Sequence, residues 1–194
     1  MSKDVKSILR KQILSARKIL QLEVWQLRND LLKDRVLEFI NKNDFQIIHS
    51  FLPIEKNKEI DTWPIIKDLI DHNKKVVISI TDFESETMSH FFYDSKIKFR
   101  LNRMKIPEPI GASPANIESI QMMLIPLITA DKKGNRIGYG KGYYDRLLEP
   151  IKDSVVKVGV SMGSLFDSFP FHEPHDIKLD YCITPHEIVK CNHD

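Results

Sequence analysis

A strand, a helix and a second strand follow one another in residues 45–80, and this order restricts the possible folds more than any other feature. Residues 45–52 ("FQIIHSFL") form a short apolar run, residues 61–72 ("DTWPIIKDLIDH") repeat apolar positions at helical spacing, and residues 75–80 ("KVVISI") are again apolar. Adjacent parallel strands need a crossover, usually a helix, because a hairpin turn cannot join them. The order therefore predicts a parallel β-α-β unit and an α/β fold.

The rest of the chain extends this pattern. Helical spacing of apolar residues predicts helices over residues 3–21 and around residues 31–39. Further predicted elements are strands at 86–93, 120–128, 155–162 and 179–184, a proline-rich loop at 106–114, and a helix from Lys141 that Pro150 ends. Because no repeat or linker interrupts the 194 residues, we expect a single domain over residues 1–194. Its three layers would be a mostly parallel (mixed) sheet flanked by helices, as in Rossmann-like folds.

The charge distribution favours a small anionic ligand. The net charge is only +2, yet the first 20 residues contain six cations and one acid. A near-balanced total argues against a broad nucleic-acid surface, and no apolar run approaches the about 20 residues that span a bilayer. Cys182 and Cys191 show no metal-binding or redox spacing, which fits a reduced, cytoplasmic compartment. We therefore expect no nucleic acid and no membrane as partners.

Residues 134–148 ("GNRIGYGKGYYDRLL") hold four glycines within nine residues, directly after a predicted strand. Gly138, Gly140 and Gly142 allow positive φ angles or the close approach of a ligand, and successive N–H groups can form an anion-binding concavity. The spacing matches neither GxxxxGK[ST] nor GxGxxG. Taken alone, the glycines are therefore equally typical of a flexible turn.

The neighbours of these glycines make a ligand site the better interpretation. Arg136 and Lys141 can donate to phosphate oxygens, and Asp145 is a hard oxygen ligand suited to Mg²⁺. Tyr139, Tyr143 and Tyr144 offer planar faces to an aromatic ring. This combination is typical of a site for a nucleoside triphosphate with its metal.

The segment resembles the signature of the 5-formyltetrahydrofolate cyclo-ligase family, and the resemblance continues in "KSILRKQ", "FLPIEKNKEIDT", "IPEP" and "HDIKLDYCIT". The resemblance implies an ATP- and Mg²⁺-dependent enzyme that closes 5-formyltetrahydrofolate to 5,10-methenyltetrahydrofolate, releasing ADP and phosphate. It also implies a protein that is a monomer or weak homodimer, with folate and ATP as its small-molecule partners.

Residue by residue, the resemblance implies catalytic roles for Arg136 and Lys141 and metal ligation by Asp145 and Asp176. The implied ATP-binding residues are Lys6, Arg10, Arg136, Ile137, Gly138, Tyr139, Gly140, Lys141, Gly142, Tyr143 and Tyr144. The implied folate-binding residues are Leu52, Glu59, Tyr139, Gly140, Lys141, Gly142 and Tyr143.

Several points stay open from the sequence. Lys6, Arg10 and Arg17 lie within about 40° of one another around a helix and form a cationic stripe. The charges alone favour a solvated face. The resemblance instead implies phosphate contacts for Lys6 and Arg10 and leaves the role of Arg17 open. The loop before Glu59 is about two residues longer than we expect for the family, so Glu55 is an alternative folate-binding acid. Ala130 and Met104 differ from the side chains usual in the family, which predicts a changed pterin pocket.

Overall fold

The computed structural model describes residues 2–102, 105–171, 173 and 175–193. Its main sheet has seven strands in the order β11-β10-β9-β6-β1-β2-β3. The five inner strands are parallel, and the two outer strands, β3 and β11, are antiparallel to their neighbours. The strands are β1 (Ile47–His49), β2 (Lys75–Thr81), β3 (Met88–Phe92), β6 (Met122–Pro126), β9 (Val156–Val160), β10 (Tyr181–Ile183) and β11 (Ile188–Lys190). The prediction of a mostly parallel, mixed sheet is confirmed.

The predicted β-α-β unit is present as β1, α3 (Trp63–Asp71) and β2. A proline in the first turn of α3 suits a helix start, because the missing N–H has no intrahelical partner there. The side chains of Ile65, Ile66 and Leu69 are buried beneath the sheet. Burial of one apolar face explains why a helix of nine residues is stable here.

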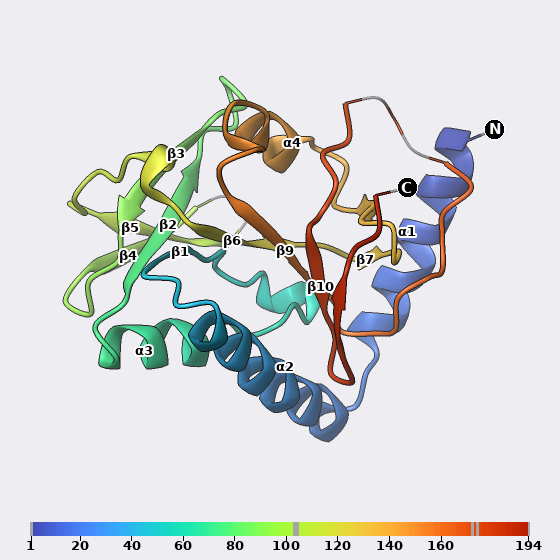
Figure 1. The fold of residues 1–194 in the computed structure, drawn as a ribbon, viewed down its shortest axis with the longest axis horizontal. Coiled ribbons are helices and arrows are strands. Elements are labelled where there is room, and N and C mark those ends of the chain that lie inside the picture. Colours follow the sequence, from blue (N-terminus) through green and yellow to red (C-terminus); the bar gives the residue numbers. More distant parts are fainter. Residues whose placement is uncertain (1, 103–104, 172, 174, 194) are drawn as a thin grey trace.

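Helices cover both faces of the sheet (Figure 1). On one face α2 (Leu22–Lys42) and α3 pack against alternate strand residues such as Ile48 and Leu124. On the other face α4 (Tyr143–Leu148) and the 3-10 turn η3 (Glu149–Ile151) pack against the intervening residues, among them Met123 and Ile125. Strand alternation therefore divides the core into two apolar layers.

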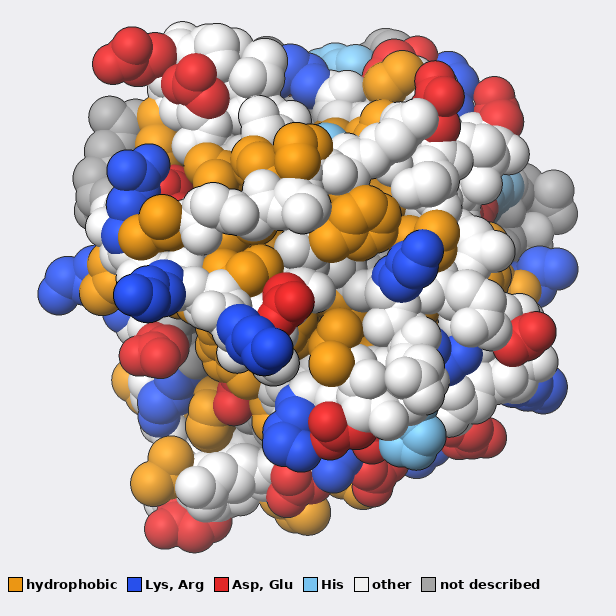
Figure 2. Space-filling model, turned by 90° about the vertical axis from the view of Figure 1, so that its left-hand side faces the viewer, with side chains coloured by type: hydrophobic (Ala, Val, Ile, Leu, Met, Phe, Trp, Pro, Cys, Tyr) orange, Lys and Arg blue, Asp and Glu red, His pale blue; other side chains and the backbone are white. Residues whose placement is uncertain are grey.

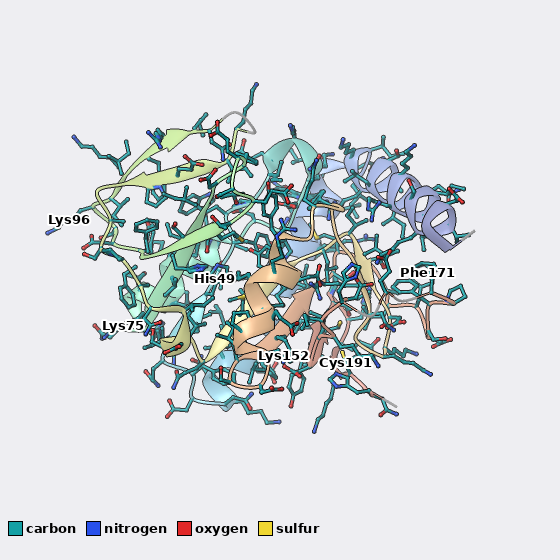
Figure 3. The ribbon with its side chains drawn as sticks, turned by 90° about the horizontal axis from the view of Figure 1, so that it is seen from above. His49, Lys75, Lys96, Lys152, Phe171 and Cys191 are labelled. Atoms are coloured by element: carbon teal, nitrogen blue, oxygen red, sulfur yellow. The ribbon has the colours of Figure 1, made fainter. Side chains whose placement is uncertain are left out.

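Helix α1 (Ser2–Lys18) lies at the side of the molecule, along the chain segment between β9 and β10 (Figure 1). Leu9 of α1 packs against the buried cluster of Ile137, Phe169 and Phe171. Figure 3 shows Phe171 beside this helix and His49 next to α4, over the middle of the sheet. The first helix is therefore placed against the segments that carry the predicted site.

The prediction of a loop at residues 106–114 is wrong in part. Residues Pro107–Ile110 form β5, which pairs with β4 (Lys98–Leu101) as a separate two-stranded ribbon. Figure 2 shows apolar side chains mixed with charged ones on this side of the molecule, where Leu101 and Ile110 are exposed. The prolines tolerate this position because the ribbon has no further strand to bond.

Three further short strands, one of them β11 at the edge of the sheet, were not predicted. The other two, β7 (Thr129–Ala130) and β8 (Arg136–Ile137), form a hairpin that precedes residues 138–143, called the glycine segment from here on. The carboxylate of Asp131 closes its turn by accepting from the backbone N–H of Lys133 and Asn135, at 3.1 and 2.8 Å. Ala130 is fully buried in the core layer beneath α4, and Met104 lies outside the described residues.

Candidate active site at the carboxyl ends of β1 and β6

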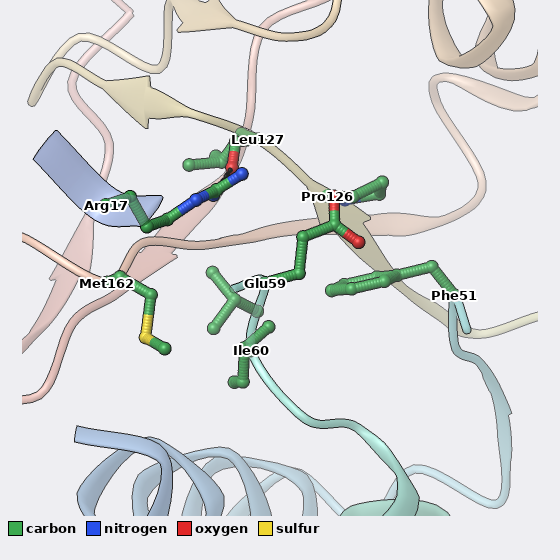
Figure 4. A pocket seen from close by; sticks show the side chains of 8 residues that line it. Arg17, Phe51, Glu59, Ile60, Pro126, Leu127 and Met162 are labelled. Carbon is green, nitrogen blue, oxygen red and sulfur yellow. Dashed lines mark hydrogen bonds between the residues drawn. The ribbon is translucent and has the colours of Figure 1, made fainter. Parts of the chain in front are cut away.

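The sheet reverses its strand order at β1, which has β2 on one side and β6 on the other. In open α/β sheets ligands bind at such a point, in the crevice beyond the carboxyl ends of the strands. The chain after β1 supplies Phe51, Glu59 and Ile60 to the crevice, and the chain after β6 supplies Leu127. Arg17 of α1 closes it from the side (Figure 4).

The glycine segment follows β8 and leads into α4. Gly140 and Gly142 have φ angles of +83° and +67°, a region that strongly favours glycine. A Cβ on Gly140 would lie 3.2 Å from the Arg10 guanidinium carbon. Gly140 therefore lets the backbone pass close to the Arg10 guanidinium, and Gly142 leaves room for the Arg146 side chain. Gly138 does not have positive φ.

Two cations of α1 reach this segment and its neighbourhood. Arg10 Nε donates to the Gly138 carbonyl oxygen at 2.8 Å. Lys6 Nζ lies 2.8 Å from Oδ2 of Asp176, so a predicted phosphate contact pairs with a predicted metal ligand. Helix α1 is thus joined to the glycine segment at one point and to the chain before β10 at another.

Arg136 and Asp145 form a second ion pair, with 2.5 Å between Nη2 and Oδ1. The Arg136 guanidinium also donates to the Ile177 carbonyl oxygen, and the Ile177 N–H donates to Asp145 at 3.1 Å. Because Ile177 follows Asp176 directly, the Asp145 carboxylate contacts the residue next to the other predicted metal ligand. Their side chains are 22% and 19% exposed.

These two carboxylates fit a Mg²⁺ ion held in part by other groups. Among the described residues there is no cluster of three or more His, Cys, Asp or Glu that could hold a metal. Mg²⁺ is commonly bound by one or two carboxylates together with phosphate oxygens and waters. Asp145 and Asp176 could therefore supply the protein's share of such a site.

Glu59 lines the crevice beside Arg17 and is 3% exposed. The Tyr139 hydroxyl donates to its Oε1, and the Ile54 N–H donates to its Oε2 at 2.6 Å. Glu55, the alternative acid, is exposed on the 3-10 turn η1 (Glu55–Asn57). The geometry therefore favours Glu59 as the acid that faces a ligand. The side chain of Leu52 is buried and packs in the same core layer as Ile60, the residue after Glu59.

Burial changes the pKa values around this acid. It raises the pKa of the Glu59 carboxyl, against the opposing effects of the Tyr139 and Ile54 hydrogen bonds and of the Arg17 charge. Burial and the nearby Glu59 charge raise the pKa values of the Tyr139 and Tyr144 hydroxyls. Both phenols are consequently neutral and able to donate at physiological pH.

The remaining predicted residues divide between the site and the core. Tyr143 is half-buried, with its ring 6.3 Å from that of Phe83 and an edge-to-face orientation, and Lys141 is exposed. Ile137 is fully buried in the cluster beneath α1, so its side chain serves packing. Tyr144 packs edge-on against His49, with 6.1 Å between ring centroids.

The sequence missed the role of one residue. The sequence left the role of Arg17 undecided. In the structure this side chain is only 6% exposed and is surrounded by hydrogen-bond acceptors. Arg17 is followed by another cation, the exposed Lys18, and nothing in the sequence separates the buried side chain from the solvated one. The contacts of Arg17 with other segments are what identify it.

Comparison with known proteins gives consistent results. The sequence model of the 5-formyltetrahydrofolate cyclo-ligase family matches residues 2–185. The 5-formyltetrahydrofolate cyclo-ligase of Escherichia coli K12 is 28% identical over 135 residues, covering 67% of this chain and 74% of the relative. The mitochondrial 5-formyltetrahydrofolate cyclo-ligase of Arabidopsis thaliana is 23% identical over 164 residues, covering 72% of this chain and 59% of the relative.

Solved structures agree with the sequence comparison. The 5,10-methenyltetrahydrofolate synthetase of Aquifex aeolicus superimposes with a TM-score of 0.81 at 26% identity, over 96% of this chain and 92% of that one. The enzyme of the same name from Mycoplasma pneumoniae shares the fold, with a TM-score of 0.74 at 24% identity over 93% and 98% of the two chains. The chain therefore belongs to the 5-formyltetrahydrofolate cyclo-ligase family of enzymes.

Proposed function

We propose that this protein closes 5-formyltetrahydrofolate to 5,10-methenyltetrahydrofolate, using ATP and Mg²⁺ and releasing ADP and phosphate. The glycine segment supports the proposal, because it lies between the cations of α1 and a buried acid. The Gly138 carbonyl oxygen accepts a hydrogen bond from Arg10, and the hydroxyl of the next residue, Tyr139, donates a hydrogen bond to the buried Glu59. A phosphate and a pterin bound to these two sides would meet on one short segment.

The chemical difficulty of the reaction explains why ATP is needed. An N-formyl group is an amide, and amide resonance makes its carbon a poor electrophile and its oxygen a poor leaving group. Transfer of the γ-phosphoryl group to the formyl oxygen removes both obstacles. N10 can then attack the activated carbon and lose its proton, and the C–O bond breaks as phosphate leaves with the electron pair.

The chain's own residues would bind and orient the two substrates. Lys6, Arg10, Arg136 and Lys141 would neutralise the phosphates, and the glycine backbone would admit them closely. Phosphoryl transfer depends on positioning and charge neutralisation more than on a covalent nucleophile. When bound by Asp145 and Asp176, Mg²⁺ would neutralise charge on the transferring phosphoryl group.

On the folate side, Leu52 and Glu59 would contact the pterin. A carboxylate is an acceptor for the N–H groups of the pterin pyrimidine ring. The tyrosines of the glycine segment, Tyr139 and Tyr143, would border the region where the two substrates meet. A buried acceptor of this kind discriminates strongly, because a ligand without the matching donors leaves it unpaired.

We further propose that the enzyme acts in the cytoplasm, as a monomer or weak homodimer, on small molecules alone. No helix in the described part of the chain is long and apolar enough to cross a membrane. The two cysteines are unpaired, which suits a reducing compartment.

The direct test is to mix the protein with ATP, Mg²⁺ and 5-formyltetrahydrofolate and to follow the absorbance of the methenyl product. We expect product only when all three are present, with one ADP formed per ring closed. The main alternative is a regulatory protein that binds a nucleotide without ring closure. That alternative is supported if no product appears while ATP still raises the melting temperature.

A further inference from the structure

Arg17 joins three segments of the crevice. Its Nε donates to the Asn57 carbonyl oxygen at 2.9 Å, its Nη1 to the Leu127 carbonyl oxygen at 3.1 Å, and its Nη2 to the Tyr139 hydroxyl at 2.5 Å. These partners lie in the loop after β1, in the chain after β6, and in the glycine segment. One side chain of α1 therefore fixes the relative positions of the three segments.

A buried guanidinium needs compensation, because removal of a charge from water is costly unless it is paired and hydrogen-bonded. The carbonyl oxygens of Asn57 and Leu127 supply partial negative charge. The Glu59 carboxyl, one hydroxyl away through Tyr139, supplies a negative charge when it is ionised. Arg17, Tyr139 and Glu59 thus form one buried polar chain that runs from α1 to the folate side of the crevice.

The direction of the hydrogen bonds in this chain is fixed. Arginine can only donate, so the Tyr139 oxygen must accept from Arg17. The Tyr139 proton is then directed to Glu59, which accepts it. Because this hydroxyl is occupied on both sides, its ring is held in one orientation and the Glu59 carboxylate is held at the crevice.

We propose that Arg17 is a positioning residue for the folate, separate from the phosphate contacts of Lys6 and Arg10 on the same helix. Through Tyr139 it holds Glu59 as an oriented acceptor for the N–H donors of a pterin-like ring. The inference rests on the proposed function. It assigns Lys6 and Arg10 of α1 to the phosphates and Arg17 of the same helix to the folate.

The groups that face Glu59 make the proposal sensitive to pH. Arg17 of α1, Tyr139 of the glycine segment and Tyr144 of α4 surround the carboxyl, together with the Ile54 N–H. Arg17 is the cation among them, and its charge opposes the rise in the Glu59 pKa that burial causes. Without Arg17, the carboxyl should become neutral at a higher pH and lose its value as an acceptor.

Arg17→Met is the informative substitution, because it keeps an unbranched apolar stem. That stem also lines a neighbouring cavity of about 270 Å³, together with Ile13, Leu20 and Phe166. Arg28→Met is the matched control. The Arg28 guanidinium lines the same cavity and donates to the Met162 carbonyl oxygen at 3.0 Å, and it makes no hydrogen bond to the Arg17–Tyr139–Glu59 chain among the described residues.

The experiment measures dissociation constants by calorimetry, for 5-formyltetrahydrofolate without ATP and for ATP without folate, between pH 5.5 and 8.5. Loss of a hydrogen bond that supports a charged group predicts about 10- to 100-fold weaker folate binding by Arg17→Met at pH 7. ATP binding should stay within about twofold of the wild type. Folate affinity should also fall at a higher pH in the variant than in the wild type, and Arg28→Met should match the wild type in all three respects.

Unchanged folate binding in a folded Arg17→Met protein would overturn the inference, as would equal losses for folate and ATP. If Arg17→Met does not fold, Tyr139→Phe tests the same chain by removing only the hydroxyl: weaker folate binding supports the inference, and unchanged folate binding overturns it. A wild-type protein that binds no 5-formyltetrahydrofolate would instead contradict the proposed function, so the two failures are distinguishable.

Discussion

The two parts of the candidate site, called here the phosphate side and the folate side, hold their charges in different ways. On the phosphate side, Lys6 pairs with Asp176 and Arg136 with Asp145, and the two acids remain about one-fifth exposed. On the folate side, Arg17 and Glu59 are almost completely buried and linked through one hydroxyl. The first arrangement consists of direct ion pairs near solvent, and the second is a closed network.

This difference implies different responses to ligands. The cations proposed for ATP and the acids proposed for Mg²⁺ neutralise each other in the structure, so binding of both ligands would exchange one set of partners for another. The folate side needs no such exchange, because its acceptor is already oriented. We therefore expect nucleotide binding to depend on metal and salt, and folate binding to depend on the integrity of the buried network.

The largest expected effect comes from Lys141→Ala. Lys141 is exposed on the glycine segment, so its removal should leave the melting temperature within about 2 °C of the wild type. Because a cation on a transferring phosphoryl group can be worth about 1,000-fold in rate, turnover should fall by about this factor. The measurement is the rate of formation of the methenyl product at saturating substrates.

Lys141→Ala tests the comparison because turnover should fall far more than folate affinity, although the resemblance also implies that Lys141 contacts the folate. Equal losses in turnover and folate affinity would show that the two sides are not separate. Arg136→Ala is a less specific test, since Arg136 also donates to the Ile177 carbonyl oxygen and is buried. Its loss should weaken folding as well as turnover.

Gly134→Ala and Gly140→Ala should separate folding from ligand binding. Both glycines have φ near +80°, but a Cβ on Gly134 would lie 2.5 Å from the Leu179 carbonyl oxygen, whereas one on Gly140 would meet only the flexible end of Arg10. Left-handed strain costs about 1–2 kcal/mol, and overpacking a further 1–3 kcal/mol. Gly134→Ala should therefore lose about 3 kcal/mol of unfolding free energy.

Gly140→Ala should lose only the smaller strain energy, together with ATP affinity through displacement of Arg10. The measurements are chemical denaturation and ATP calorimetry on both variants. If Gly140→Ala proved the less stable of the two, the segment would be a structural turn, as the glycine spacing alone also allowed.

The parallel sheet could be predicted from sequence because its strands are continuous apolar runs separated by a periodic helix. The β4–β5 ribbon could not, because Pro107 and Pro109 argue against a strand unless its bonding partner is known. The loop after β1 was ambiguous for a similar reason. Lys58 takes a left-handed conformation after η1, with φ of +45°, and it is this turn that presents Glu59 rather than Glu55.

Three cations of α1 show that residues on the same face of a helix need not belong to the same site. Lys6, Arg10 and Arg17 do share one face, as their spacing predicts. Lys6 and Arg17 are nevertheless about 16 Å apart along the axis, at 1.5 Å per residue. Different segments lie opposite each position, and only the folded chain brings Asp176 to one and Tyr139 to the other.

Like Arg17 and Glu59, His49 is a buried ionisable residue, and its ring packs against that of Tyr144. Complete burial and the nearby His90 lower the pKa of His49 from 6.5 to about 3, although the Leu124 backbone acts in the opposite direction. The folded protein therefore keeps His49 neutral, while the unfolded chain binds a proton below pH 6.5. This contribution to stability is complete above pH 6.5 and is lost as the pH falls toward 3, by about 2 kcal/mol at pH 5.

His49→Leu should remove this part of the pH dependence. The measurement is the free energy of unfolding at pH 7.5 and pH 5, and the wild type should lose about 2 kcal/mol more than the variant between the two. His186→Gln is the control, because His186 is exposed. A wild type and a His49→Leu variant with the same slope would mean that His49 can be protonated in place.

The smallest effect, and the one most specific to the phosphate side, is expected for Lys6→Met. Lys6 is 2.8 Å from Asp176 and partly exposed. Loss of a screened charge-assisted contact predicts about tenfold weaker ATP binding. Binding of Mg²⁺ in the absence of nucleotide should change in the opposite direction and become stronger, because Asp176 no longer has a competing cation. Calorimetry with ATP and with MgCl₂ measures both, and Lys11→Met, an exposed change on the same helix, should alter neither. Weaker binding of both ligands by Lys6→Met would mean that the lysine holds Asp176 in place for the metal, and that the phosphate side is prearranged like the folate side.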